Sequence, residues 1–349
     1  MKLDVVPETL LERLVLRAGL VPRPFLHTLV AAGIARVILV AVKLGVIDVL
    51  DESDMTAQEI GAELGTDPGA TRKLLNALTA MGYLRLTGDR YSLAPEARKW
   101  LLRSSPTSLR DFILEQELIE WKALDQLEAF VRSGTALDLH SDLEDEHWAL
   151  YQRGMRNIAS LSAAEVARRV PVPKRARDML DIGGSHGYHS VMLCKRHPGL
   201  RSTILDLPEA VKHAAPILER EGMGDRVTHR VGDATTEDIG VEAFDLVYTA
   251  NVVHHLDDEA NRDLARRAAR ALRPGGYYVV VDAIRPRSPN EGVGTLGDLF
   301  FALTSRAGTW SFEEISGWQL AAGLEPQKPI RLRTSPGAGI QAAVKRAPN

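Results

Sequence analysis

The spacing of apolar positions changes along this 349-residue chain. From residue 178 onward, short apolar runs typical of buried strands alternate with segments in which apolar residues recur at helical spacing. The pattern predicts strands at 178–182, 201–206, 226–231, 244–249 and 277–282, and helices at 187–196, 208–221 and 258–272. Such alternation is typical of a doubly wound, Rossmann-like parallel sheet with helices on both faces.

Two further apolar runs follow, at 328–333 and 339–345, joined by Ser335, Pro336 and Gly337. A link this short suits an antiparallel hairpin at the edge of the sheet. The predicted fold class of this half is therefore α/β, with an antiparallel C-terminal hairpin.

The first third of the chain is mainly helical and carries different signals. Thr56 and Glu59 have capping-box spacing, Gly65 ends that helix, and Asp67 opens a second one. Two short alternating runs follow at 83–86 and 90–93, as in a hairpin. Two helices followed by a hairpin predict a winged-helix domain.

The most apolar stretch, residues 29–50, contains Arg36 and Lys43. A membrane helix needs about 20 nearly unbroken apolar residues, so we expect a buried or subunit-contacting helix and no membrane partner. Prolines 171 and 173 mark a boundary after a helical pattern. We expect an N-terminal winged-helix domain at 1–106, a helical linker roofing a pocket at 107–173, and a ligand-binding domain at 174–349.

Composition describes an ordinary soluble protein, with 45% hydrophobic and 26% charged residues and a formal net charge of -3. Winged helices commonly bind DNA, yet residues 36–103 hold nine Lys and Arg against nine Asp and Glu. This balance lacks the basic footprint of a nucleic-acid partner. One cysteine, Cys194, and no secretory signal at the start predict a cytoplasmic location.

A glycine-rich turn follows the first predicted strand of the α/β half. Asp181 ends the strand, Gly183 and Gly184 allow a ligand to approach the backbone, and Gly187 lets the next helix begin close to the sheet. The turn predicts a bound nucleoside.

Acids stand at the ends of the other predicted strands too. Asp206 ends the second strand, Asp233 follows the third, and Asp282 ends the fifth. Because the carboxyl ends of parallel strands meet at one edge, these carboxylates should line a ligand crevice there. Asp206 is placed to accept hydrogen bonds from ribose hydroxyls, and Asp233 from an adenine amino group.

Two other classes remain open at this point. A winged-helix DNA-binding regulator could use the nucleoside as an effector. A nicotinamide-dependent oxidoreductase could use the same kind of sheet, although its fingerprint needs glycines where this chain has Ser185 and Tyr188.

Four runs carry a more specific resemblance: LDIGGSHG at 180–187, LDLPE at 205–209, GDA at 232–234 and LRPGG at 272–276. They are similar to the motifs of class I S-adenosylmethionine-dependent methyltransferases. Together with its winged-helix part, the chain resembles the two-domain O-methyltransferases of plant and bacterial small-molecule metabolism. The resemblance implies S-adenosylmethionine as cofactor, S-adenosylhomocysteine as its product, and a homodimer built on the N-terminal domain.

The resemblance also implies which residues bind the donor. Its methionine part would meet Asp181 and Gly183, its ribose Asp206 and Leu207, and its adenine Asp233 and Ala234, with Gly184, Gly187 and Asn251 completing the site.

The segment 251–259 resembles the family's His-Asp-Trp-x-Asp motif and places His254 on the catalytic histidine. A general base of this kind typically contributes a factor of about 10² to 10⁴ by taking the hydroxyl proton as the new bond forms. By resemblance, Asp282 is the carboxylate that orients His254. A metal site is not expected, because neither a helical His-x-x-x-His pair nor a cysteine cluster is present.

The chain departs from the family motif at three places. His255 replaces the usual Asp or Asn, Leu256 replaces the usual Trp, and Ala307 stands near the place of a second acid. These departures leave open a C- or N-methyltransferase that works by proximity alone.

Two residues before the α/β half, Tyr151 and Met155, resemble the pair that borders the family's acceptor pocket. His255, Asp298 and Phe301 are further candidates for acceptor contact. Apolar lining with few polar groups suits a hydrophobic ligand. The expected reaction is methyl transfer to a hydroxyl of a small, largely apolar acceptor, aromatic or polyketide-like.

Overall fold

The computed structural model describes residues 7, 9–137, 143–305 and 307–347. The chain forms two compact units that divide after Leu114. Most of the segment predicted as a helical linker, 107–173, falls within the second unit. Its longest helix, α11 (Asp145–Arg169), packs against helices of the α/β half.

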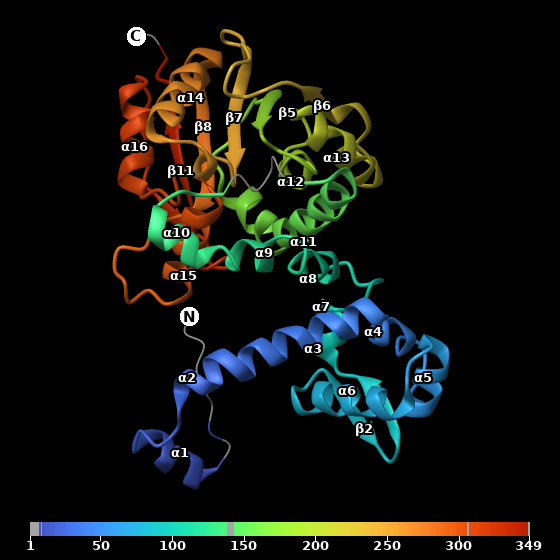
Figure 1. The fold of residues 1–349 in the computed structure, drawn as a ribbon. Coiled ribbons are helices and arrows are strands. Elements are labelled where there is room, and N and C mark those ends of the chain that lie inside the picture. The colour runs from blue at the N-terminus through green and yellow to red at the C-terminus, as the bar shows by residue number, and fades with distance from the viewer. Residues whose placement is uncertain (1–6, 8, 138–142, 306, 348–349) are drawn as a thin grey trace. The chain divides into compact units, whose positions relative to one another are not determined.

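The N-terminal unit is built from helices and a small sheet (Figure 1). Its elements are helices α1 (Leu10–Arg17), α2 (Arg23–Phe25), α3 (Ala31–Leu44), α4 (Val46–Val49), α5 (Ala57–Leu64), α6 (Pro68–Ala80) and α7 (Pro95–Trp100), the π-helical segment η1 (Leu26–Val30), and strands β1 (Met55–Thr56), β2 (Leu84–Thr87) and β3 (Arg90–Leu93). Helix α8 (Arg110–Glu115) ends at the division between the units.

The winged-helix prediction is confirmed. Thr56 Oγ1 accepts a hydrogen bond from the Glu59 amide, and the Glu59 carboxylate accepts one from the Thr56 amide. Gly65, at φ 65°, ends α5, and Asp67 caps α6. The strands pair antiparallel in the order β1-β3-β2, which is the predicted hairpin with one short strand added.

Residues 29–50, predicted as a buried or subunit-contacting helix, lie in η1, α3 and α4, and the N-terminal part of the segment is exposed in the single chain. Residues 29–44 belong to one helix, Arg23–Leu44, that is long and apolar enough to cross a membrane by length and composition, with 17% of its most apolar window buried. Leu29 is 61% exposed and Ile34 41%. Only the C-terminal part of α3, with Leu39, Ala41 and Val42, is buried. The N-terminal part therefore presents an apolar surface.

The second unit contains the large sheet. Its helices are α9 (Glu120–Leu124), α10 (Leu127–Ser133), α11, α12 (Tyr188–Arg196), α13 (Pro208–Arg220), α14 (Asp258–Ala271), α15 (Val293–Thr304) and α16 (Phe312–Ala321), with 3-10 turns η2 (Gly224–Arg226) and η3 (Val253–His255). Its strands are β4 (Asp178–Ile182), β5 (Arg201–Asp206), β6 (Val227–Val231), β7 (Phe244–Ala250), β8 (Leu272–Ala283), β9 (Glu325–Pro326), β10 (Ile330–Arg331) and β11 (Ala338–Val344).

The sheet has the order β10-β11-β8-β7-β4-β5-β6, with β9 paired to β11. Strands β4 to β8 are parallel and β11 is antiparallel to both β8 and β10, so the predicted doubly wound sheet with an antiparallel edge is confirmed. Helices α14 and α16 lie on one face and α11, α12 and α13 on the other (Figure 1). An apolar core lies between the sheet and the helices on each of its two faces.

Candidate active site

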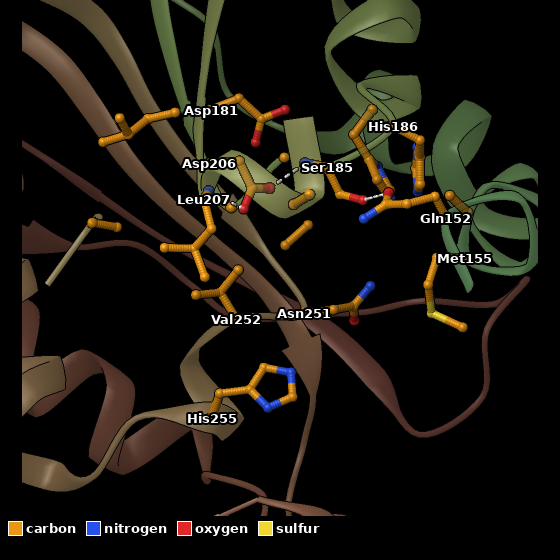
Figure 2. A pocket seen from close by; sticks show the side chains of 18 of the residues that line it. Gln152, Met155, Asp181, Ser185, His186, Asp206, Leu207, Asn251, Val252 and His255 are labelled. Carbon is orange, nitrogen blue, oxygen red and sulfur yellow. Dashed lines mark hydrogen bonds between the residues drawn. The ribbon is translucent and has the colours of Figure 1, made fainter. Parts of the chain in front are cut away.

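A cavity of about 290 Å³ opens at the carboxyl ends of β4, β5 and β7, where a ligand is expected in an open parallel sheet (Figure 2). Every lining residue belongs to the second unit. The lining comprises Trp148, Tyr151, Gln152, Met155, Ile158 and Ala159 of α11; Asp181, Gly183, Gly184, Ser185, His186 and His189; Leu205, Asp206, Leu207, Ala210, Gly232, Asp233, Ala234 and Thr235; and Ala250, Asn251, Val252, His255 and Leu256.

The glycines of the turn have no room for a side chain. A Cβ on Gly183 would lie 2.5 Å from Val252, and one on Gly184 would lie 2.5 Å from the carboxyl group of Asp181. Gly187, at φ 74°, begins α12, and a Cβ there would meet Ile204 and Leu218. Gly187 therefore serves packing and does not line the cavity.

Asp181 lies at the floor of the cavity and is completely buried. Its Oδ2 accepts a hydrogen bond of 2.5 Å from Ser190, whereas its Oδ1 has no partner among the described residues. Burial raises the pKa of Asp181 to about 7, and the charge of Asp206 adds to the shift. A buried carboxyl oxygen without a partner suits a cationic or hydrogen-bonding group of a ligand.

Asp206 and Asp233 also face the cavity, as the sequence predicted. Asp206 accepts 2.8 Å hydrogen bonds from the amides of Ser185 and Leu207, and burial raises its pKa. Asp233 accepts from the amide and hydroxyl of Thr235. Backbone donors thus fix both carboxylates at the rim.

Two non-glycine residues of the lining adopt left-handed backbone conformations, Ser185 at φ 51° and Asn251 at φ 56°. Such conformations cost of order 1–3 kcal/mol and cluster at functional sites. The Asn251 side chain points toward the part of the cavity that His255 and Met155 border (Figure 2).

His254 and Asp282 form a buried pair. The Nδ1 atom of His254 lies 2.7 Å from Oδ1 of Asp282, and the two residues are 3% and 1% exposed. Asp282 also accepts hydrogen bonds from the amides of Val253 and Ala283. A carboxylate that accepts at Nδ1 leaves Nε2 as the basic nitrogen.

The turn that carries the histidines is fixed from two sides. Asn261 donates its side-chain amide to the carbonyls of Val253 and Leu256, and Trp310 donates its indole N–H to the same Val253 carbonyl. Trp310 therefore supports η3.

His255 lines the cavity, whereas His254 is absent from the lining. The rings of His255 and Phe301 cover His254, with centroids 4.0 Å and 4.3 Å from it. His255 Nδ1 lies 3.3 Å from the hydroxyl of Ser305. The two adjacent histidines thus occupy different layers, one at the cavity wall and one behind it.

Some of the candidate acceptor residues likewise line the cavity and others do not. Tyr151, Met155 and His255 line the cavity, whereas Asp298 and Phe301 do not. Asp298 accepts a hydrogen bond from the Thr309 hydroxyl. The structure thus brings three of the five candidates together at the cavity wall.

Several lining residues were not assigned to the site from the sequence, among them Trp148, Gln152, His186 and His189. Burial lowers the pKa of His186 to about 3 and that of His189 to about 4, so both are neutral near pH 7. The recurrence of lining residues along α11 at helical spacing was a usable signal for Gln152. His186, in the glycine turn, and His189, on α12, had no such signal.

Among the residues that the structure describes, the lining has three carboxylates and no lysine or arginine. S-adenosylmethionine carries a positive sulfonium and a positive ammonium group, so the charge of the cavity fits it. The side-chain-free approach at Gly183 and Gly184 and the open Oδ1 of Asp181 fit the same compound.

The family is decided by comparison with known proteins. Residues 123–322 match the O-methyltransferase domain, and residues 27–103 match the O-methyltransferase dimerisation domain. The chain belongs to the O-methyltransferase family. This family of enzymes uses S-adenosylmethionine as methyl donor.

Two relatives and one solved structure are similar to this chain. The O-demethylpuromycin-O-methyltransferase of Streptomyces alboniger is 26% identical over 88% of this chain and 84% of its own length. The mitomycin biosynthesis 6-O-methyltransferase of Streptomyces lavendulae is 29% identical over 73% and 75%. The structure of human N-acetylserotonin methyltransferase, solved with S-adenosylmethionine, superposes with a TM-score of 0.80 at 19% identity, covering 99% of this chain and 100% of that one.

Proposed function

We propose that this O-methyltransferase moves the methyl group of S-adenosylmethionine to a hydroxyl of a small, largely apolar acceptor, with His254 as the general base. The observation that carries the proposal is the cavity in which Asp181, Asp206 and Asp233 meet at the carboxyl edge of the sheet, next to the buried His254–Asp282 pair.

The donor half of the cavity is assigned by chemistry. When bound, the donor supplies an electrophilic methyl group on a positively charged sulfur. Asp206 would hold the ribose beside Leu207, and Asp233 the adenine beside Ala234. Asp181 would lie next to the methionine part at Gly183 and Gly184, and Asn251 lines the same cavity.

The proton of the acceptor hydroxyl would pass to Nε2 of His254. Asp282 holds Nδ1, so its negative charge stabilises the imidazolium that forms. The rings of His255 and Phe301 pack against His254, so the hydroxyl would have to reach Nε2 past them. The remaining rate enhancement would come from holding oxygen, methyl carbon and sulfur in line.

The acceptor half of the cavity is bordered by Tyr151, Met155 and His255. Trp148 packs edge-to-face on Tyr151, with ring centroids 5.7 Å apart. Aromatic and aliphatic walls with few polar groups favour a flat, apolar ligand. The two Streptomyces relatives are named for O-demethylpuromycin and for mitomycin biosynthesis, which supports a small natural product as acceptor.

The chain is expected to work as a homodimer in the cytoplasm. The dimerisation-domain match at 27–103 includes most of the apolar Arg23–Leu44 helix. A second copy that covers the exposed side chains of this helix would remove a large apolar patch from water.

The direct test has two parts. Isothermal calorimetry should detect binding of S-adenosylmethionine to the full chain. Labelled donor, incubated with a panel of hydroxylated aromatics and polyketides, should then give methyl ethers by mass spectrometry. Label on carbon or nitrogen would reject the hydroxyl as acceptor, and no donor binding would reject the assignment as a whole.

A further inference from the structure

Gln152 joins the acceptor wall to the donor turn. It lies on α11 between Tyr151 and Met155, is 1% exposed, and lines the cavity. Its Oε1 accepts a hydrogen bond from the hydroxyl of Ser185, in the glycine turn (Figure 2). The contact connects two segments that are 33 residues apart.

Ser185 links three elements through three different polar groups. Its hydroxyl donates to Gln152, its amide donates to Asp206 Oδ2 at 2.8 Å, and its carbonyl lies 2.8 Å from Nε2 of His229. Its backbone is left-handed, at φ 51°, which a residue with a side chain rarely adopts without outside contacts. These contacts therefore hold the turn in an otherwise unfavourable shape.

We infer that Gln152 is a positioning residue of the donor site, which acts through Ser185 to fix the turn and the carboxylate of Asp206. The inference rests on the proposed use of Asp206 to hold the donor ribose. Because α11 also carries Tyr151 and Met155, the same hydrogen bond sets the acceptor wall against the donor turn.

A double-mutant cycle on donor affinity tests the link. Gln152→Met keeps the length of the side chain, and Ser185→Ala removes only the hydroxyl. Each single variant of the full chain should bind S-adenosylmethionine about five- to tenfold more weakly in calorimetry, as expected for one lost hydrogen bond. The double variant should bind S-adenosylmethionine no more weakly than either single variant, because the two substitutions remove the same contact.

Ser185→Gly separates positioning from stability. Glycine accepts the left-handed backbone, so the melting temperature should stay or rise, while donor affinity falls as in Ser185→Ala. A residue that served stability alone would give parallel changes in the two quantities. Ser160→Ala is the matched control, because Ser160 is on the same helix and its hydroxyl donates to the Asn157 carbonyl, away from the glycine turn.

The outcomes distinguish the two proposals. Unchanged affinity in both single variants, or effects that add in the double variant, would overturn the role of Gln152 and leave the proposed function standing. If the unaltered chain failed to bind S-adenosylmethionine, the proposed function and this inference would both be overturned.

Discussion

His254 Nδ1 lies 2.7 Å from Asp282 Oδ1, in a place where both side chains are almost completely buried. Two backbone amides, of Val253 and Ala283, also donate to this carboxylate. The carboxylate is therefore satisfied without an external ion, and it fixes which ring nitrogen is available to a substrate. This arrangement suits proton transfer to Nε2 of His254, which lies behind the residues that line the cavity.

Replacing His254 tests the general base. His254→Asn should lower kcat by about 10² to 10⁴, because the proton then has no positioned acceptor. The affinity for S-adenosylmethionine should change little, since His254 does not line the cavity. Steady-state kinetics and calorimetry measure the two effects. Unchanged turnover would reject His254 as the base and leave the methyltransferase assignment intact.

Asp206 tests the donor site. Asp206→Ala removes both oxygens that would accept from the ribose and leaves the Ser185 and Leu207 amides without their present partner. Donor affinity should fall by about tenfold or more, as expected when a charged hydrogen-bond acceptor is lost. Asp233→Ala provides the comparison at the adenine end. If calorimetry gave unaltered affinity for Asp206→Ala, the ribose would have to bind elsewhere.

The sequence located the sheet and its acids because both have strong local signals. Strands β4 and β5 coincide with their predicted ranges, and their last residues or neighbours are the acids of the cavity. The edge strand of the large sheet was harder to predict from the sequence. Strand β10 comprises only Ile330–Arg331, although the apolar run at 328–333 covers six positions. Pairing at an edge depends on register with β11, and the run alone does not determine it.

Tertiary packing decided what sequence patterns left open. Adjacent histidines look equivalent in the sequence, yet only packing against Phe301 and Asp282 places His254 behind the wall and His255 on it. Likewise, helical spacing places Gln152 on the same face of α11 as Met155, but only the fold shows that this face meets the glycine turn.

Asp181 predicts a pH dependence of donor binding. Burial raises the pKa of Asp181 to about 7, whereas its ordinary pKa in the unfolded chain is 3.8. Between these two pH values the folded chain keeps a proton on Asp181 that the unfolded chain has released. The contribution of Asp181 to stability is thus complete below about pH 4 and is lost as the pH rises through 7. A cationic donor favours the ionised carboxyl, so its affinity should rise with pH over the same interval.

Calorimetry at pH 6 and pH 8 measures this effect. S-adenosylmethionine should bind about tenfold more weakly at pH 6, where roughly one Asp181 in ten is ionised. Asp181→Asn keeps an oxygen for Ser190 and should reduce the pH dependence, although burial also raises the pKa of Asp206. His186 and His189 stay neutral over this interval, since burial lowers their pKa values to about 3 and 4. If Asp181→Asn showed the same pH dependence as the unaltered chain, the titration of another group would be its cause.

The apolar helix Arg23–Leu44 predicts where two copies meet. Leu29 is 61% exposed in the chain alone, so Leu29→Asp should leave the folded unit stable. In a dimer, the same change would bury an unpaired carboxylate against apolar side chains, which costs several kcal/mol. Sedimentation velocity should therefore show a dimer for the unaltered chain and a monomer for Leu29→Asp.

Leu320→Asp is the matched control, because Leu320 is 66% exposed on α16, outside the segment that matches the dimerisation domain. It should remain dimeric. A dimer that survives Leu29→Asp would move the contact surface away from this helix, and a monomeric unaltered chain would reject the homodimer. Because the cavity is lined by the second unit alone, the monomeric Leu29→Asp variant should still bind S-adenosylmethionine. Loss of donor binding together with the dimer would show that the site depends on the second copy.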